Sequence, residues 1–178
     1  MFRRRDSVQQ RCASRLAALG LDPAPDIDAF LSQLAAHRGR PLERVGFPAA
    51  PGTEELCGAW VPLGETDFIF YEEDSSSSFF RDHTVLHECG HIIGGHQPSV
   101  DAALPWLERV FPDLDERLVR GALFRHDYEK PEEVEADAMA TIIAAQLGGS
   151  PERAAPTAPA DTASSLDRLA RALGTTGA

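Results

Sequence analysis

The chain has 178 residues, 43% of them hydrophobic, and a formal net charge of −11, which suits one folded domain with a sizeable core. The acidic balance argues against a surface that wraps nucleic acid, because such a surface needs a basic face. No apolar run approaches the length of a membrane span, and the polar residues after "MFRRR" predict no secretory leader. Three scattered cysteines do not suggest a disulfide framework. We therefore expect a cytoplasmic domain that binds neither nucleic acid directly nor a membrane.

Two helices are expected at the start of the chain. Residues 6–19 have a helical pattern with Asp6 or Ser7 as the N-cap, and residues 27–37 repeat apolar side chains at helical spacing. The first helix is also rich in arginine. These arginines are expected to form a solvated face, with a docking patch for an acidic partner as the alternative: Arg3, Arg4, Arg5, Arg11 and Arg15.

A small sheet is expected next. Strand-like segments at 42–47, 57–61 and 68–71 predict a three-stranded antiparallel sheet, and a turn around Gly64 joins the last two as a hairpin. Segment 68–71 is a candidate sheet edge for pairing with an extended substrate, and an ordinary core strand is the equal alternative.

The second half of the chain predicts two longer helices and a tail. The fold class is α+β and mostly helical, with residues 149–178 forming a flexible linker and a short C-terminal helix. The expected domain spans residues 1–148 and contains four parts: N-terminal helices (6–38), the sheet (41–72), and helices at 79–93 and 131–148.

The stretch "HECGH" indicates a metal site. His87 and His91 lie four residues apart on one face of the helix, so both imidazoles can bind one ion. Glu88 lies beside them, where it can contact a water at the ion rather than the ion. The alternative is a pair of surface histidines with a glutamate between them. A catalytic zinc site needs a third protein ligand and an open position, so two histidines leave it incomplete.

The following helix supplies the favoured third ligand. Glu133 and Asp137 share a face, so Glu133 can bind the metal while Asp137 accepts the free ring N–H of a ligand histidine. Glu135 points about 200° away from Glu133 and is the second choice. His96, five residues after His91, is expected at the helix end or in the pocket wall, and it remains the other alternative.

The segments "HECGH" and "EVEADAMA" together resemble the ImmA/IrrE family of zinc-dependent peptidases, over about residues 40–148. The second segment is similar to the family pattern E-x-x-A-[ND]-x-F-A, with Met139 in place of the usual Phe. The resemblance implies a zincin-like, gluzincin-type domain that holds one Zn²⁺ per chain. It also implies the roles of four residues: His87, His91 and Glu133 as zinc ligands and Glu88 as the catalytic base.

The resemblance further implies a metallopeptidase that cuts a separate cytoplasmic protein. In the better understood family members this protein is a helix-turn-helix transcriptional repressor, and its cleavage lifts repression in a stress response. His126 and Tyr128 are candidates to stabilise the oxyanion, and each can equally be a packing residue. Two alternatives stay open. One is a metal-dependent regulatory module that binds its repressor without cutting it, and the other is a structural zinc site closed by His96.

Overall fold

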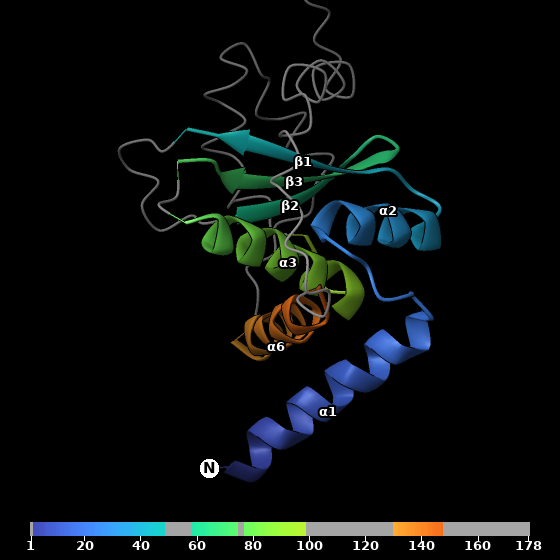
Figure 1. Ribbon diagram of the computed structural model, residues 1–178, viewed down its shortest axis with the longest axis vertical. Coiled ribbons are helices and arrows are strands. Elements are labelled where there is room, and N and C mark those ends of the chain that lie inside the picture. The colour runs from blue at the N-terminus through green and yellow to red at the C-terminus, as the bar shows by residue number, and fades with distance from the viewer. Residues whose placement is uncertain (1, 49–57, 75–76, 99–129, 148–178) are drawn as a thin grey trace, which may run out of the picture.

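The computed structural model of the chain describes residues 2–48, 58–74, 77–98 and 130–147. The predicted tail, residues 149–178, and the two oxyanion candidates, His126 and Tyr128, lie outside the described residues. Seven elements are described (Figure 1): α1 (Phe2–Leu19), α2 (Ile27–Arg38), β1 (Leu42–Phe47), β2 (Gly58–Leu63), β3 (Thr66–Glu72), α3 (Ser78–Gly94) and α6 (Lys130–Leu147).

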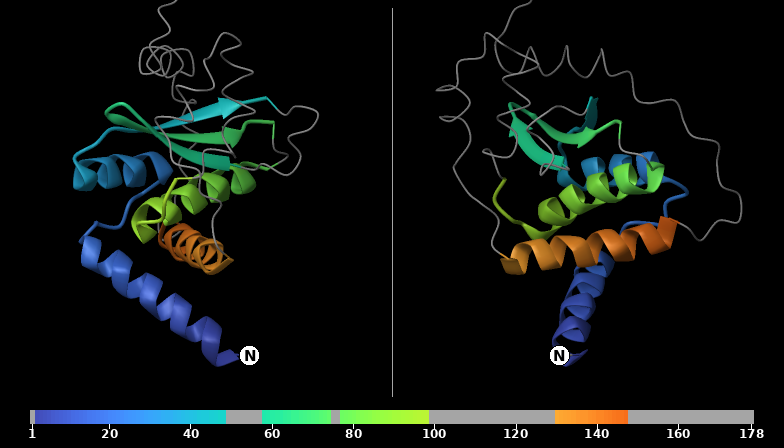
Figure 2. Two further views of the ribbon diagram at one scale, coloured as in Figure 1. Left: turned by 180° about the vertical axis from the view of Figure 1, so that it is seen from behind. Right: turned by 90° about the vertical axis from the view of Figure 1, so that its left-hand side faces the viewer.

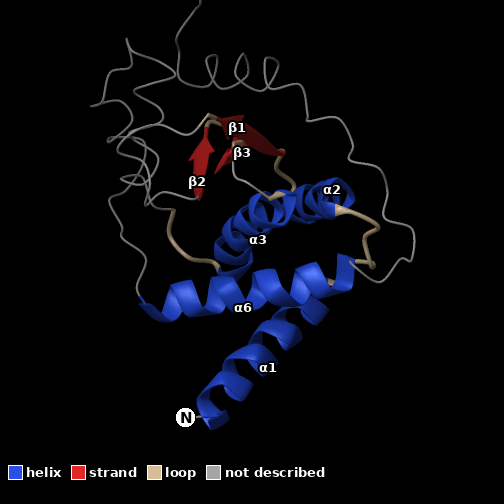
Figure 3. Cartoon of the chain, turned by 60° about the vertical axis from the view of Figure 1, so that its left-hand side comes forward, coloured by secondary structure: helices blue, strands red, loops and turns tan. Residues whose placement is uncertain are grey.

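The elements are stacked in layers, which the views of Figure 1 and Figure 2 show from three sides. The sheet forms one outer layer, and α2 and α3 lie together under one of its faces. Helix α6 packs against the opposite side of α3, and α1 crosses α6 at the far end of the stack (Figure 3). One apolar core runs through these layers, with buried side chains from all the helices and from the sheet. The α+β class predicted from the sequence is confirmed.

The sheet is mixed, so the antiparallel prediction was wrong. Its strand order is β1-β3-β2, with β2 antiparallel to β3 and β1 parallel to β3. The predicted hairpin around Gly64 is present, because the turn between β2 and β3 is too short for any other pairing. The connection between β1 and β2 is longer, and it lets the chain pass to the other side of β3 instead of forming a second hairpin.

Strand β3 lies in the centre of the sheet, so segment 68–71 is not the sheet edge that one interpretation of the sequence expected. Five consecutive residues of β3, from Asp67 to Tyr71, are buried, which fits a central strand that is paired on both sides. The two edge strands among the described residues are β1 and β2.

Helix ends follow the capping signals in the sequence, with one exception. Asp26 caps α2 by accepting the N–H of Ala29, and Ser77 caps α3 by accepting the N–H of Phe79. Helix α1 starts at Phe2, so the N-cap predicted at Asp6 or Ser7 was wrong. Nothing between Phe2 and Asp6 interrupts a helix, because the segment holds no Gly or Pro. None of the described helices is long and apolar enough to cross a bilayer.

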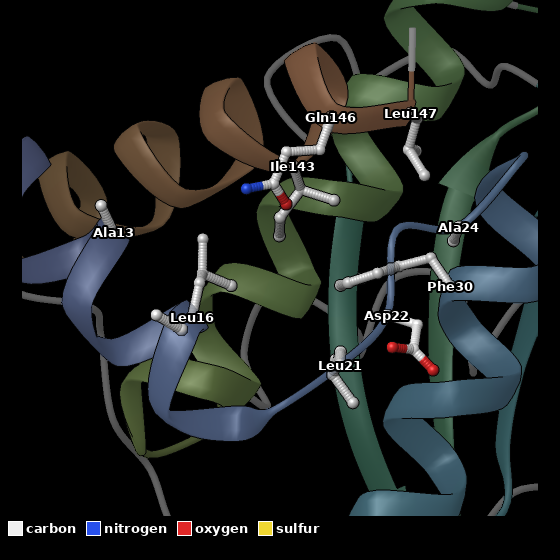
Figure 4. Close-up of a pocket in the computed structure, with 10 residues that line it drawn as sticks. Ala13, Leu16, Leu21, Asp22, Ala24, Phe30, Ile143, Gln146 and Leu147 are labelled. Atoms are coloured by element: carbon white, nitrogen blue, oxygen red, sulfur yellow. The ribbon is translucent and has the colours of Figure 1, made fainter. Parts of the chain in front are cut away.

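A small cavity of about 120 Å³ lies where α1, α2 and the end of α6 meet (Figure 4). Most of the residues that line it are apolar, among them Leu16, Phe30 and Ile143, and the polar side chains Asp22 and Gln146 also line it. None of the predicted metal ligands lines this cavity, so it is separate from the site described next.

Candidate metal centre

Helix α3 carries the two histidines of "HECGH" on the side that faces α6. A stripe of apolar residues on α3, including Val85, Cys89 and Ile92, is buried in the core and fixes the rotation of the helix. His91 is fully buried, whereas the side chain of His87 is 20% exposed. One histidine therefore lies inside the helix interface and the other at its rim.

Helix α6 brings Glu133 to these histidines. Its carboxylate oxygens lie 3.4 Å from Nε2 of His87 and 3.5 Å from Nε2 of His91, and the two Nε2 atoms lie 3.0 Å apart. Glu135 points to another side of α6 and pairs with Arg15 of α1 at 3.0 Å. The structure thus brings His87, His91 and Glu133 together, and this group could hold a metal ion.

The spacing of the three ligand atoms fits a small divalent ion. Zinc–ligand bonds of about 2.0–2.2 Å at tetrahedral angles place neighbouring ligand atoms about 3.3–3.6 Å apart. Each carboxylate oxygen of Glu133 approaches one histidine within this range, Oε2 at 3.4 Å from His87 and Oε1 at 3.5 Å from His91, and the histidine–histidine distance of 3.0 Å is slightly shorter. One ligand atom from each of the three residues lies within 4.8 Å of the other two. Two imidazoles and one carboxylate are also the donor set of a catalytic zinc site.

The close approach of α3 and α6 depends on Gly90. A Cβ atom at this position would lie 2.7 Å from the carbonyl oxygen and 2.8 Å from the Cα of Ala136, so backbone meets backbone here. Gly90 and Ala136 lie next to the ligands on their respective helices. The small residues therefore allow ligands from both helices to reach one point.

The ring nitrogens that do not face Glu133 have partners of their own. Nδ1 of His87 lies 3.0 Å from a carboxylate oxygen of Asp137, the contact that the sequence predicted for one of the two histidines. Nδ1 of His91 lies 2.9 Å from Nδ1 of His96. His96 is buried at the end of α3, with this nitrogen turned to His91 rather than to the converging ligand atoms.

Burial keeps His91 uncharged. Loss of solvent, together with the neighbouring charges of His87 and His96, lowers the pKa of His91 to about 3. The ring is therefore neutral at pH 7, which is the state that a metal ligand requires.

Glu88 is buried between α3 and the sheet and is only 4% exposed. Its Oε2 accepts a hydrogen bond of 2.9 Å from the backbone N–H of Trp60 in β2. Burial raises the pKa of Glu88 to about 7, although His87 and the Trp60 N–H act in the opposite direction. A carboxyl group with such a pKa can both take and give a proton near neutral pH.

Sequence patterns did not reveal two further contacts of the site. Gly58 starts β2 where a Cβ atom would lie 2.4 Å from Thr84 and 3.2 Å from Oε1 of Glu88, so only glycine fits there without displacement. Arg15, expected on a solvated helix face, instead pairs with Glu135 and donates a hydrogen bond to the Gly94 carbonyl. Both contacts join segments far apart in the sequence, and no local pattern signals them.

We compared the chain with family models, curated proteins and solved structures, and none of them matches it.

Proposed function

We propose that the chain is a zinc-dependent metallo-endopeptidase of the zincin-like, gluzincin type. The observation that carries this proposal is the convergence of His87, His91 and Glu133 from two helices, with the carboxyl group of Glu88 on the same helix as the histidines. Three protein ligands leave a coordination position open for chemistry. In this proposal the enzyme acts in the cytoplasm on one regulatory protein, such as a helix-turn-helix repressor.

The residues of the chain divide the reaction between them. A divalent ion held by His87, His91 and Glu133 would acidify a water and polarise the scissile carbonyl. Glu88 would take the proton of the attacking water and return it to the leaving amine, and its raised pKa suits both steps. Its Oε1 atom is the free candidate for this task, because Oε2 holds the Trp60 N–H. We retain His126 and Tyr128 as proposed oxyanion donors.

A second function is favoured by the burial of Glu88. A carboxylate that is 4% exposed and bonded to the backbone of β2 also serves as a link between α3 and the sheet. In that case the chain would be a metal-dependent regulatory module that binds a partner repressor without cutting it. Both functions need the three ligands, but only the peptidase needs Glu88 as a base.

The variant Glu88→Gln separates the two functions. Its amide oxygen can still accept the Trp60 N–H, so we expect the fold and zinc content to remain those of the wild type. Wild-type protein with zinc and the variant with zinc are incubated with a peptide library prepared from a whole-cell lysate, and new peptide ends are identified by mass spectrometry. Glu65→Gln, the same change in the exposed β2–β3 turn, is the matched control.

New peptide ends with the wild type and the control, but about a hundredfold fewer with Glu88→Gln, would support the peptidase. Equal cleavage by Glu88→Gln would show that Glu88 is not the base. The absence of zinc-dependent cleavage by any version, with zinc bound, would favour the binding module.

A further inference from the structure

A chain of five side chains passes through the candidate metal centre. It runs from Asp137 to His87, His91 and His96 and ends at Glu135, with a contact between each neighbouring pair. The first three contacts measure 3.0, 3.0 and 2.9 Å. In the last contact, Nε2 of His96 lies 3.7 Å from Glu135, which is too long for a direct hydrogen bond. The carboxylate still favours an N–H on the nitrogen that faces it.

The protons available do not satisfy all four contacts. When all three imidazoles are neutral, as metal binding requires of His87 and His91, each carries one N–H, and an ionised carboxylate at either end of the chain can only accept. With Nδ1–H of His87 directed at Asp137 and Nε2–H of His96 directed at Glu135, one proton remains, on His91. That proton can lie between His91 and His96 or between His91 and His87.

The position of this proton decides whether His91 can bind a metal. A proton on Nδ1 of His91 leaves two bare nitrogens, Nε2 of His87 and Nε2 of His91, facing each other at 3.0 Å, where a cation removes their repulsion. A proton on Nε2 of His91 blocks the ligand atom. The tautomer of His91 with its proton on Nδ1 leaves Nε2 open to a metal. This tautomer is stabilised only if Nδ1 of His96 carries no proton and accepts the hydrogen bond from Nδ1–H of His91.

We propose that His96 and Glu135 are positioning residues that hold His91 in the tautomer that binds the metal. Glu135 places the proton of His96 on Nε2, and the bare Nδ1 of His96 then accepts the Nδ1–H of His91. This inference rests on the proposed metal centre and gives a role to the two residues that the sequence left as alternative ligands.

Helix α1 anchors the far end of this chain. Arg15 lies 3.0 Å from Glu135 and 2.9 Å from the carbonyl oxygen of Gly94, which precedes His96 by two residues. The arginine therefore holds both Glu135 and the backbone that carries His96. The N-terminal helix thereby supports His91, a proposed ligand on α3, through Glu135 and His96.

The test measures zinc affinity by competition with a chromophoric chelator. His96→Leu removes both ring nitrogens at similar volume, and we expect zinc binding to weaken by about 10–100-fold. His96→Asn places an amide oxygen near the Nδ1 position and should restore affinity to within about threefold of the wild type. A fourth ligand would not be rescued in this way, because an amide is a poor zinc ligand. A further variant, Glu135→Gln, removes the carboxylate that faces His96. Glu132→Gln, which removes one negative charge from the same helix, is its control.

The double variant Glu135→Gln/His96→Asn tests whether Glu135 acts through the tautomer of His96. Glu135→Gln should weaken zinc binding in the wild-type background but not in the His96→Asn background, where no ring tautomer remains to be fixed. Long-range ¹H–¹⁵N NMR spectra give a second measurement, which needs no metal. They should place the proton of His96 on Nε2 in the metal-free protein and that of His91 on Nδ1 after zinc is added.

The outcomes separate this inference from the proposed function. If the wild type binds zinc and His96→Leu binds it equally well, the positioning role fails and the metal centre stands. If the wild type binds no zinc, the proposed function fails, and the NMR spectra of the metal-free protein still test the tautomer. A proton on Nδ1 of His96 in those spectra would overturn the inference.

Discussion

Gly90 determines how close the two ligand-bearing helices can come. The atoms that a side chain at this position would meet belong to the backbone of α6, which cannot rotate away as a flexible side chain can. Because His91 and Glu133 lie on opposite sides of this contact, a change in the separation of the helices changes the distance between ligands. One residue without a side chain therefore supports the geometry of the whole site.

Gly90→Ala should lower both stability and zinc affinity. Forcing one methyl group into this contact is expected to cost about 1–3 kcal/mol, measured by urea unfolding of the zinc-free protein. Zinc affinity should fall as well, because α6 has to move away with Glu133. Thr141→Ala, at an exposed position on α6, is the control and should change stability by less than about 0.5 kcal/mol. Wild-type stability and affinity in Gly90→Ala would contradict the proposed contact.

At the level of elements, Asp67 joins the sheet to α2. Its fully buried carboxylate accepts hydrogen bonds from Arg38 at 2.9 Å and from the indole N–H of Trp60 at 3.1 Å. Arg40 adds a third charge contact at 3.1 Å, and the Arg38 guanidinium lies over the Trp60 ring. The end of α2, strand β2 and strand β3 thus meet at one charged group.

Asp67→Ala should destabilise the fold by about 2–4 kcal/mol, because it leaves the two arginines and a buried indole N–H without their acceptor. The cost stays below that of a fully buried pair because both arginine side chains are more than a quarter exposed. Asp28→Ala removes an ion pair with Arg44 in which the aspartate side chain is 39% exposed, and we expect it to cost about 1 kcal/mol, less than Asp67→Ala. Equal unfolding midpoints for the two variants in urea would disprove the role of Asp67.

The described helices could be predicted from the sequence, apart from the start of α1, because the signals are local. The cap at Ser77, the apolar stripe of α3 and the four-residue spacing of His87 and His91 all lie within one helix. The preference for Glu133 over Glu135 followed from helix geometry, and the structure places Glu133 beside His87 and His91, whereas Glu135 lies near His96.

Other features could not be predicted because they depend on contacts between distant segments. β1 pairs with β3 in parallel although β2 lies between them in the sequence, and no strand pattern records which neighbour a strand takes. The sequence left segment 68–71 equally open to an edge strand and a core strand, and the structure places β3 in the centre of the sheet. The contact of Arg15 with Glu135 spans 120 positions and has no local signal.

For the whole molecule, metal binding and folding should be linked. The ligands come from α3 and α6, so an ion that binds only the folded chain stabilises the packing of these helices. Free zinc at a hundredfold excess over its dissociation constant contributes about 2.7 kcal/mol. This should raise the melting temperature by about 5–10 °C for a chain of this size.

Differential scanning calorimetry with zinc and with a chelator measures this shift. Glu133→Gln, which keeps the size of the side chain but removes the charged ligand, should abolish the shift while leaving the melting temperature of the zinc-free protein nearly unchanged. A shift of equal size in Glu133→Gln would show that zinc stabilises the protein at another place.

The position of α6 between α1 and α3 has a consequence for how the protein is made. Asp137 and His87 meet in the folded site although 50 positions separate them in the chain. Synthesis at about 5–20 residues per second leaves the two histidines on the ribosome for about 3–10 seconds before their carboxylate partners exist. The apolar faces of α1 and α3 that α6 covers are exposed during the same interval. In the proposed metal centre, metal loading would therefore be a late event in biosynthesis, because a nascent chain that stops before α6 lacks Glu133 and the part of the core that Met139, Ala140 and Ile143 supply.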